Sequence, residues 1–583
     1  MKDRWLSLMR VFARGLTSVR CWWCVCLVWA AILAWAGRDA MNPDGVSYLD
    51  MASGTLSHGP AQLVSANWSP GYPAIVALVF MLFHPSTSQE FPLVHLINFV
   101  IFVLVLWAFT FFLRSWLRAD IATEVDEHET ARYITPLAFG MFLWFTMEFI
   151  GLDLVTPDLL VAAMVFVAAG MVCRLSRSGS TGLRPYVLLG LALGLGYYAK
   201  TVLFPSGLAL LAVLFLVRPN RNLSRKGLLA SGLVFLAVAA PLVALISARV
   251  GRVSIGEAGR LSYIWYVNHR NLLSHNYWEG NFGKAYATLE HPPRMVMERP
   301  MTIEFSTPLP GTFPLWYDPP YWWQGEAARL DWRQQIVALE ANLGGILPDM
   351  KVVILGSLVL LILATRRKVA PIERRSRFWL VAWPLAVCSM LALVRVENRY
   401  LAPFLVLFWL AVYRTLMLRV NVRTRATILA GVLSMLLVPQ AVVLASAAAI
   451  AARNRRQEPE YRTIARGLTE LGIHGGDRLA VVGYAFDSYY ARFARVQVTA
   501  DVEDADEFWR LSEADLKRLE DRLAASGVKA LVARNRPAGS WPERWRDLDG
   551  TKSARFSVLL LGERRVAAVR EPRSAPIAPG GKL

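Results

Sequence analysis

The sequence predicts a polytopic α-helical membrane protein that carries a smaller α/β domain at its C-terminal end. Of the 583 residues, 55% are hydrophobic and only 18% are charged, whereas soluble domains carry about 25% charged residues. The apolar residues fall in repeated blocks of about 20 residues, which is the length that crosses a bilayer. Arginine clusters flank these blocks, so membrane topology explains the net charge of +19 and no nucleic-acid partner is expected.

The first apolar block, residues 21–36, follows a basic N-terminal segment. This outline also fits a cleavable signal peptide that ends in small residues. Many further apolar blocks follow, so we expect an uncleaved first span. The basic flank predicts that the N-terminus lies in the cytoplasm.

Ten further blocks are near a spanning length and bring the predicted number of transmembrane helices to about 11. They are residues 91–113, 133–150, 159–172, 186–199, 202–217, 228–250, 352–365, 378–394, 400–418 and 426–451. The apolar stretch 72–83 is too short for a span and begins in a Pro-Gly-Tyr-Pro sequence. We expect it to form a helix that lies on the outer face of the membrane or dips into it.

This arrangement places the arginine clusters at 174–184, 218–226, 366–377 and 419–425 in cytoplasmic loops, as the positive-inside rule requires. Three polar regions then lie outside: the loop 38–90, the large loop 251–349 and the chain after residue 452.

The sequence therefore predicts a transmembrane domain over 1–452 and a periplasmic domain over 453–583. In the tail, helix-like segments 461–471 and 511–525 alternate with strand-like runs 479–483, 528–532 and 558–561, a pattern typical of a small α/β domain.

Ionisable residues at the outer edge of the spans are candidates for function, because such groups are costly near a membrane. Asp44 follows the first span, and Asp158 closes the short outer loop before the span 159–172. Either residue could instead be an N-cap of the helix that follows it. Lys200 lies on the outer side between two spans, where snorkelling toward headgroups is the alternative. Arg399 lies in another outer turn, near Arg395 and Glu397, and an internal Arg–Glu pair is its alternative role.

The large outer loop is rich in aromatic residues. Its densest part contains Trp316, Tyr317, Asp318 and Trp322. These four residues are candidates for binding a sugar or an acceptor, since aromatic faces offer apolar contact while their polar edges form hydrogen bonds. The alternative is an aromatic belt that anchors the loop at the headgroups.

Several short motifs occur in a fixed order between residues 22 and 451. They are Asp44-x-x-x-Tyr48, Trp68-Ser69-Pro70-Gly71-Tyr72-Pro73, Thr156-Pro157-Asp158, Gly190-x-x-x-Gly194-x-Gly196-Tyr197-x-x-Lys200 and Arg399-Tyr400-x-x-Pro403. In this order they resemble the GT-C class of membrane glycosyltransferases, and in particular the branch of protein O-mannosyltransferases and aminoarabinose transferases.

The resemblance implies a bacterial inner-membrane enzyme that moves a sugar from a polyprenyl-phosphate donor to a hydroxyl acceptor on the periplasmic face, with inversion. It implies that Asp44 and Asp158 are the catalytic acidic residues. The positions matched to the donor phosphate and lipid are Lys200, Arg399, Tyr400 and Tyr48.

The chain departs from the pattern of the family in three places. Gly45 stands where the family often has a second acidic residue, and Ser47 and Ser69 stand where the aminoarabinose branch has basic residues. The sugar, the acceptor and the need for a divalent cation therefore stay open. Two other functions also stay open: a transporter or flippase of lipid-linked sugar, and a non-catalytic scaffold. Transporters usually place polar groups at the midplane of the membrane, whereas the charges here cluster at its outer edge.

Overall fold

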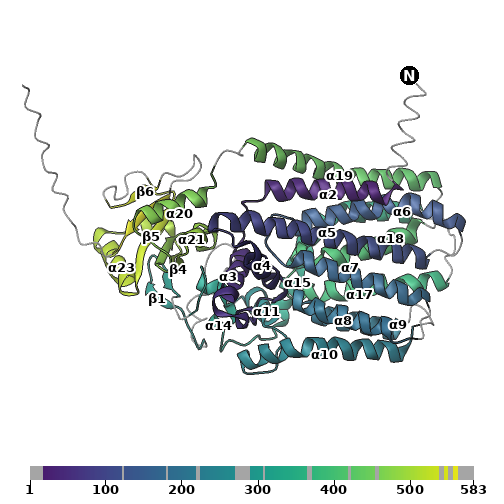
Figure 1. Cartoon of the computed structure of the whole chain (residues 1–583), viewed down its shortest axis with the longest axis horizontal. Helices are drawn as coiled ribbons and strands as arrows, with labels where there is room; N and C mark the ends of the chain where they lie inside the picture. Colours follow the sequence, from purple (N-terminus) through teal and green to yellow (C-terminus); the bar gives the residue numbers. More distant parts are fainter. Residues whose placement is uncertain are drawn as a thin grey trace, which may run out of the picture.

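The chain forms a bundle of long helices with a sheet-containing layer at one end (Figure 1). The computed structural model describes residues 17–120, 124–178, 182–217, 223–269, 289–305, 309–363, 371–417, 420, 422–453, 458–537, 544–548 and 556–561. Much of the arginine clusters predicted at 218–226, 366–377 and 419–425 lies outside the described residues.

Among the described residues, seven helices are long and apolar enough to cross a membrane. They are α2 (Val19–Ala36), α5 (Thr87–Asp120), α6 (Glu124–Trp144) with its π-helical end η2 (Phe145–Ile150), α7 (Asp158–Ser178), α10 (Arg225–Val250), α18 (Asn398–Met417) and α19 (Val422–Arg453). An eighth span results if α15 (Trp332–Asp349) and α16 (Lys351–Ile362), which are bent by 74°, count as one.

The remaining predicted blocks fall in three helices that, over their described residues, are not long and apolar enough to count among the seven. These are α8 (Arg184–Ala199), α9 (Leu203–Val217) and α17 (Pro371–Ala392). Each apolar block thus lies mainly within a helix, and the total of 11 spans stays a prediction. The stretch predicted to lie at the outer face forms α4 (Gly71–Phe83). Its 13 residues extend over only about 20 Å, which is shorter than a bilayer core.

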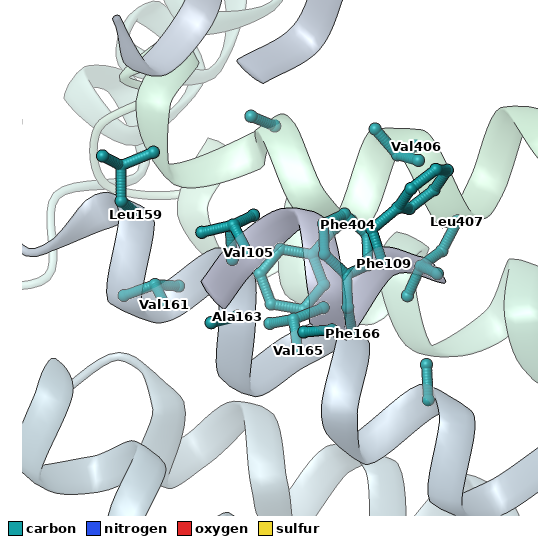
Figure 2. Packing of buried hydrophobic residues seen from close by; sticks show 14 of the residues in the cluster. Val105, Phe109, Leu159, Val161, Ala163, Val165, Phe166, Phe404, Val406 and Leu407 are labelled. Atoms are coloured by element: carbon teal, nitrogen blue, oxygen red, sulfur yellow. The ribbon is translucent and has the colours of Figure 1, made fainter. Parts of the chain in front are cut away.

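The centre of the bundle is packed by aromatic and small residues. Figure 2 shows Phe109 of α5, Phe166 of α7 and Phe404 of α18 meeting in one cluster. The rings of Phe109 and Phe166 lie edge to face, with centroids 5.3 Å apart. A Cβ at Gly170 of α7 would lie 2.5 Å from the ring of Phe111. The small residue therefore allows α5 and α7 to approach closely, as in other membrane helix pairs.

The layer at the end of the bundle contains one seven-stranded sheet, in the order β1-β2-β4-β3-β5-β7-β6. Its central strands β4, β3 and β5 are parallel, and the outer pairs are antiparallel. The tail supplies five strands: β3 (Arg478–Val482), β4 (Gln497–Val502), β5 (Val528–Arg534), β6 (Arg546–Leu548) and β7 (Phe556–Leu560).

The other two strands, β1 (Arg294–Met297) and β2 (Thr302–Glu304), come from the large loop 251–349. The helices of the tail are α20 (Glu460–Glu470), α21 (Tyr490–Ala494), α22 (Ala505–Trp509) and α23 (Glu513–Ala525). The α/β character predicted for the C-terminal region is confirmed, while the sheet also includes strands from the loop.

Candidate active site

Turns from four segments meet where the helical bundle joins the sheet layer. Asp44 lies in the first turn of α3 (Pro43–His58), which follows α2. Asn42, and not Asp44, is the N-cap of this helix. The Asn42 side chain accepts a hydrogen bond from the backbone N–H of Val155 at 2.8 Å, which ties the turn to the segment before α7. The alternative role of Asp44 as a cap is therefore not what the structure shows.

Asp158 and Lys200 form a buried pair. Asp158 begins α7 and its side chain is fully buried. Lys200 ends α8, and its Nζ lies 2.6 Å from Oδ1 of Asp158. The same ammonium lies 3.8 Å from the ring centroid of Tyr400, a cation–π geometry. Lys200 therefore points into the protein, and the alternative of snorkelling toward headgroups does not describe it.

Arg399 joins this pair to Asp44. It lies at the beginning of α18, and its Nη2 donates to Oδ2 of Asp44 at 3.0 Å. Its Nε lies 3.7 Å from Oδ2 of Asp158. The four side chains thus alternate in sign, from Asp44 through Arg399 and Asp158 to Lys200. The internal Arg–Glu pair that was the alternative for this turn forms between Arg395 and Glu397, with Nε and Oε1 2.9 Å apart, and does not involve Arg399.

Tyr48 lies beneath this cluster, one turn along α3 from Asp44. Its ring packs edge to face against both Trp68 and Tyr72, with centroids 5.3 Å away in each case. Burial raises the pKa of the Tyr48 hydroxyl well above its usual value, and the nearby carboxylates of Asp44 and Asp158 add to this effect. The phenol is therefore neutral at physiological pH.

The motif from Trp68 to Pro73 positions the turn that carries Lys200. The backbone N–H of Thr201 donates to Ser69 Oγ at 3.0 Å. A Cβ on Gly71 would lie 2.7 Å from the carbonyl oxygen of Tyr198, so only glycine allows α4 to approach the end of α8 this closely. The motif therefore positions the turn with Lys200 through the Ser69 hydroxyl and through the close backbone approach at Gly71.

A small cavity of about 140 Å³ lies over the charged cluster. Its lining includes Asp44, Tyr48, Ser69, Lys200, Arg395, Arg399 and Tyr400. The site residues predicted for the donor phosphate thus surround one cavity. Its described lining carries three basic side chains and two carboxylates, Asp44 and Glu397, and the excess of positive charge suits an anion.

The four aromatic-loop candidates separate in space. Trp316 lies in the site, where its Nε1 donates to Oδ1 of Asp44 at 3.1 Å. Tyr317 is next to it and accepts a hydrogen bond from the Trp68 indole on its backbone oxygen at 3.0 Å. Asp318 instead pairs with Arg249 at 2.7 Å, beside a different cavity. Trp322 is buried in the core of the sheet layer, where it donates to the carbonyl of Pro314.

A second, larger cavity of about 930 Å³ shares Asp44, Trp316 and Arg399 with the first. Its wall includes Tyr484 and Phe486, which follow β3 in the tail. Sequence reasoning missed both residues because the tail was treated as separate from the transmembrane domain. It also missed Trp265, whose ring stacks on Trp316 with centroids 5.7 Å apart.

A divalent cation fits this arrangement poorly. Among the described residues, no three His, Cys, Asp or Glu side chains gather closely enough to hold a metal ion. Asp44 and Asp158 are the two carboxylates of the cluster, and each is already neutralised by the guanidinium of Arg399 or the ammonium of Lys200.

No family model and no curated protein sequence matches the chain. Among solved structures, the chain is similar to ArnT from Cupriavidus metallidurans in the apo state, with 13% identity over 93% of this chain and 98% of ArnT, at a TM-score of 0.48. It is also similar to the oligosaccharyltransferase of Archaeoglobus fulgidus tethered to an acceptor peptide. This match has 12% identity over 88% of this chain and 69% of the other, at a TM-score of 0.46. A third structure, archaeal AglB from Archaeoglobus fulgidus with an inhibitory peptide and a dolichol-phosphate, gives a TM-score of 0.43 at 12% identity, again over 88% of this chain and 69% of the other. ArnT and AglB are GT-C glycosyltransferases, the class that the sequence motifs resemble.

Proposed function

We propose that the protein is a membrane glycosyltransferase that moves a sugar from a polyprenyl-phosphate donor to a hydroxyl acceptor on the periplasmic face of the bacterial inner membrane. The observation that carries the proposal is the contact of Arg399 with Asp44 at 3.0 Å in a cavity that Lys200 also lines. This places a carboxylate next to two cations, which are the groups that such a transfer needs.

The donor phosphate binds to Lys200 and Arg399, and the Tyr400 hydroxyl, to which Arg399 donates at 3.5 Å, lies beside them. Because the phosphate then competes for the guanidinium, the Asp44 carboxylate is released to accept a proton. The phosphate leaves as a monoester without needing a proton of its own, so one base and two cations are sufficient.

The bonds change in one displacement at the anomeric carbon of the sugar. The acceptor oxygen forms a bond to this carbon while the bond from the carbon to the phosphate oxygen breaks, and the acceptor proton passes to Asp44. Attack from the side opposite the phosphate inverts the configuration. Asp158 touches Lys200 and Arg399 and holds the two cations in place.

The test uses purified protein in lipid, radiolabelled undecaprenyl-phosphate sugars and an envelope extract as the source of acceptors. Wild type is compared with Asp44→Asn and with the matched control Asp39→Asn. Asp39 is a carboxylate outside the cavity that pairs with Arg462 at 3.1 Å, much as Asp44 pairs with Arg399.

We expect label to move to an acceptor with the wild type and with Asp39→Asn, and the rate to fall by a factor of about 10² to 10⁴ with Asp44→Asn. Equal transfer by Asp44→Asn would remove Asp44 as the base. Binding of donors without transfer from any of them would favour a transporter of lipid-linked sugar.

A further inference from the structure

A loop of the tail lines the larger cavity together with residues of the charged cluster. Tyr484 and Phe486 follow the C-terminal end of β3 and line the same cavity as Asp44 and Arg399. Phe486 is held in place by Trp316, with ring centroids 5.2 Å apart, and by Phe313 at 4.8 Å. The tail therefore forms part of the wall around the reacting groups.

The carboxylates of this cavity outnumber its cations. Among the residues that the structure describes, its lining includes four carboxylates, Asp44, Glu148, Asp349 and Glu397, and two basic residues, Arg395 and Arg399. Both arginines contact carboxylates, at Glu397 and Asp44. This leaves a net negative charge in the wall.

The remaining two carboxylates bond to amides. Asp349 accepts from the side-chain amide of Asn398 at 2.7 Å, and Glu148 accepts from Gln440. Amides do not neutralise charge. These two carboxylates therefore repel an acceptor that carries phosphate or carboxylate groups, and they accept hydrogen bonds from hydroxyls.

The other lining groups are aromatic rings. Tyr266, Trp316, Tyr484 and Phe486 come from the loop 251–349 and from the tail. Flat rings beside hydrogen-bond acceptors suit a sugar ring, whose C–H faces are apolar and whose edge carries hydroxyls. The volume of about 930 Å³ is at the upper end of the range of about 300–1,000 Å³ for small-molecule sites, which gives room for an oligosaccharide.

From these observations we propose that the larger cavity binds the acceptor, that the acceptor is an uncharged oligosaccharide, and that Tyr484 of the tail packs against one of its rings. The inference rests on the transfer reaction proposed above, because it assigns the second substrate of that reaction. The small basic cavity then holds the donor phosphate, and the two substrates meet at Asp44.

The test measures acceptor binding without transfer. Saturation-transfer NMR is recorded on the full chain in lipid nanodiscs with four neutral probes: maltotetraose, cellotetraose, chitotetraose and mannotetraose. Tetragalacturonate is the anionic probe, and a threonine-containing peptide is the probe for a protein acceptor. The variants are Tyr484→Ala, Tyr484→Phe and the double variant Glu148→Gln with Asp349→Asn. Tyr321→Ala is the matched control, because Tyr321 lies in the same layer beside a different cavity.

We expect at least one neutral probe to bind and the anionic probe to bind about tenfold more weakly. Tyr484→Ala should weaken binding of the neutral probe about tenfold, whereas Tyr484→Phe and Tyr321→Ala should leave its affinity unchanged. The double variant should remove most of the discrimination against tetragalacturonate. Thermal unfolding of each variant distinguishes loss of binding from loss of fold.

Three results would overturn the inference: preference for the anionic probe or for the peptide, no binding of any neutral probe, or equal binding by Tyr484→Ala. Failure of the proposed reaction gives a different pattern. In that case no donor supports transfer, while a neutral oligosaccharide still binds in a way that depends on Tyr484.

Discussion

The guanidinium of Arg492, on α21 of the tail, lies 2.7 Å from the carboxylate of Asp50, on α3. Both side chains are about 5% exposed. Arg492 also reaches Glu90 of α5 at 2.9 Å and donates to Ser53 at 2.6 Å. Asp50 accepts from the backbone N–H of Thr312 in the large loop at 2.7 Å. One arginine therefore joins the tail to the helix that carries Asp44.

Arg492→Ala should loosen this junction, because the variant leaves the buried carboxylate of Asp50 without its cation, while Glu90 keeps only Arg495. The expected cost is about 3–5 kcal/mol. Thermal unfolding and hydrogen exchange of α3 measure it. Lys517→Ala, which removes an exposed pair with Asp521, is the comparison and should change stability by less than about 1 kcal/mol. Equal effects of the two variants would contradict the assignment.

Variants of Lys200 and Asp158 can distinguish a structural role of Lys200 from a role in binding the donor phosphate. Lys200→Met leaves the buried carboxylate of Asp158 with only the more distant guanidinium of Arg399, at 3.7 Å, and should destabilise the protein by up to about 3–5 kcal/mol. Adding Asp158→Asn removes that charge, so the double variant should regain most of its stability. It should not regain transfer, since the donor phosphate has lost one cation. Recovery of both properties would show that Lys200 serves the fold alone.

Gly71→Ala tests the backbone fit beside Lys200. The added Cβ meets the Tyr198 carbonyl at 2.7 Å, so α4 and the end of α8 must move apart. We expect transfer to fall about tenfold or more, because a displacement of about 1 Å at a reacting group has effects of up to about 10². Gly232→Ala is the control, since its nearest neighbour would be a leucine methyl at 3.8 Å. Unchanged transfer by Gly71→Ala would mean that the turn adapts without displacing Lys200.

Asp501 of β4 should make the stability of the sheet layer depend on pH. Its side chain is buried, and burial together with the nearby Glu503 raises the pKa of Asp501 well above its usual value. The folded protein therefore holds a proton that the unfolded chain loses above about pH 4. The free energy of unfolding therefore falls as the pH rises from about 4 to the raised pKa of Asp501. Above that pKa, the loss of stability due to Asp501 no longer changes with pH.

Asp501→Asn should consequently raise the unfolding temperature more at about pH 8 than at about pH 5. The asparagine keeps an oxygen for the hydrogen bond that the backbone of Ala485 donates to this side chain. Asp521 pairs with Lys517 at the surface, where its side chain is 63% exposed, so Asp521→Asn serves as the control. A gain that is independent of pH would show that Asp501 is already ionised at the lower pH.

The sequence predicts most of the helices because a bilayer permits few alternatives. A block such as 91–113 has to be helical to satisfy its backbone groups in lipid, and it forms the middle of α5. The strands are harder to predict. β4 has the sequence Gln-Val-Thr-Ala-Asp-Val, which buries Thr499 and Asp501 as well as its apolar residues. β1 and β2 have only four and three residues, too few for a pattern.

The charged residues of the site could be predicted because each is unusual at its position along the chain. Asp44, Asp158, Lys200 and Arg399 all lie at the same end of spans, and they meet in the structure. The aromatic residues carry no such local signal. Trp316 lies in the cavity while Trp322, six residues later, lies in the core, and only the packing of the loop against the tail decides between them.

The inclusion of β2 between β1 and β4 has a consequence for how the protein can be made and altered. β2 pairs with β4 through residues about 200 positions apart in the chain. During synthesis, the hydrogen-bonding edge of β2 has no partner until β4 has been made. The tail therefore cannot be removed, or exchanged between proteins, as an independent domain. A chain that stops at residue 452 leaves the edge of β2 that pairs with β4 without a partner, which favours aggregation.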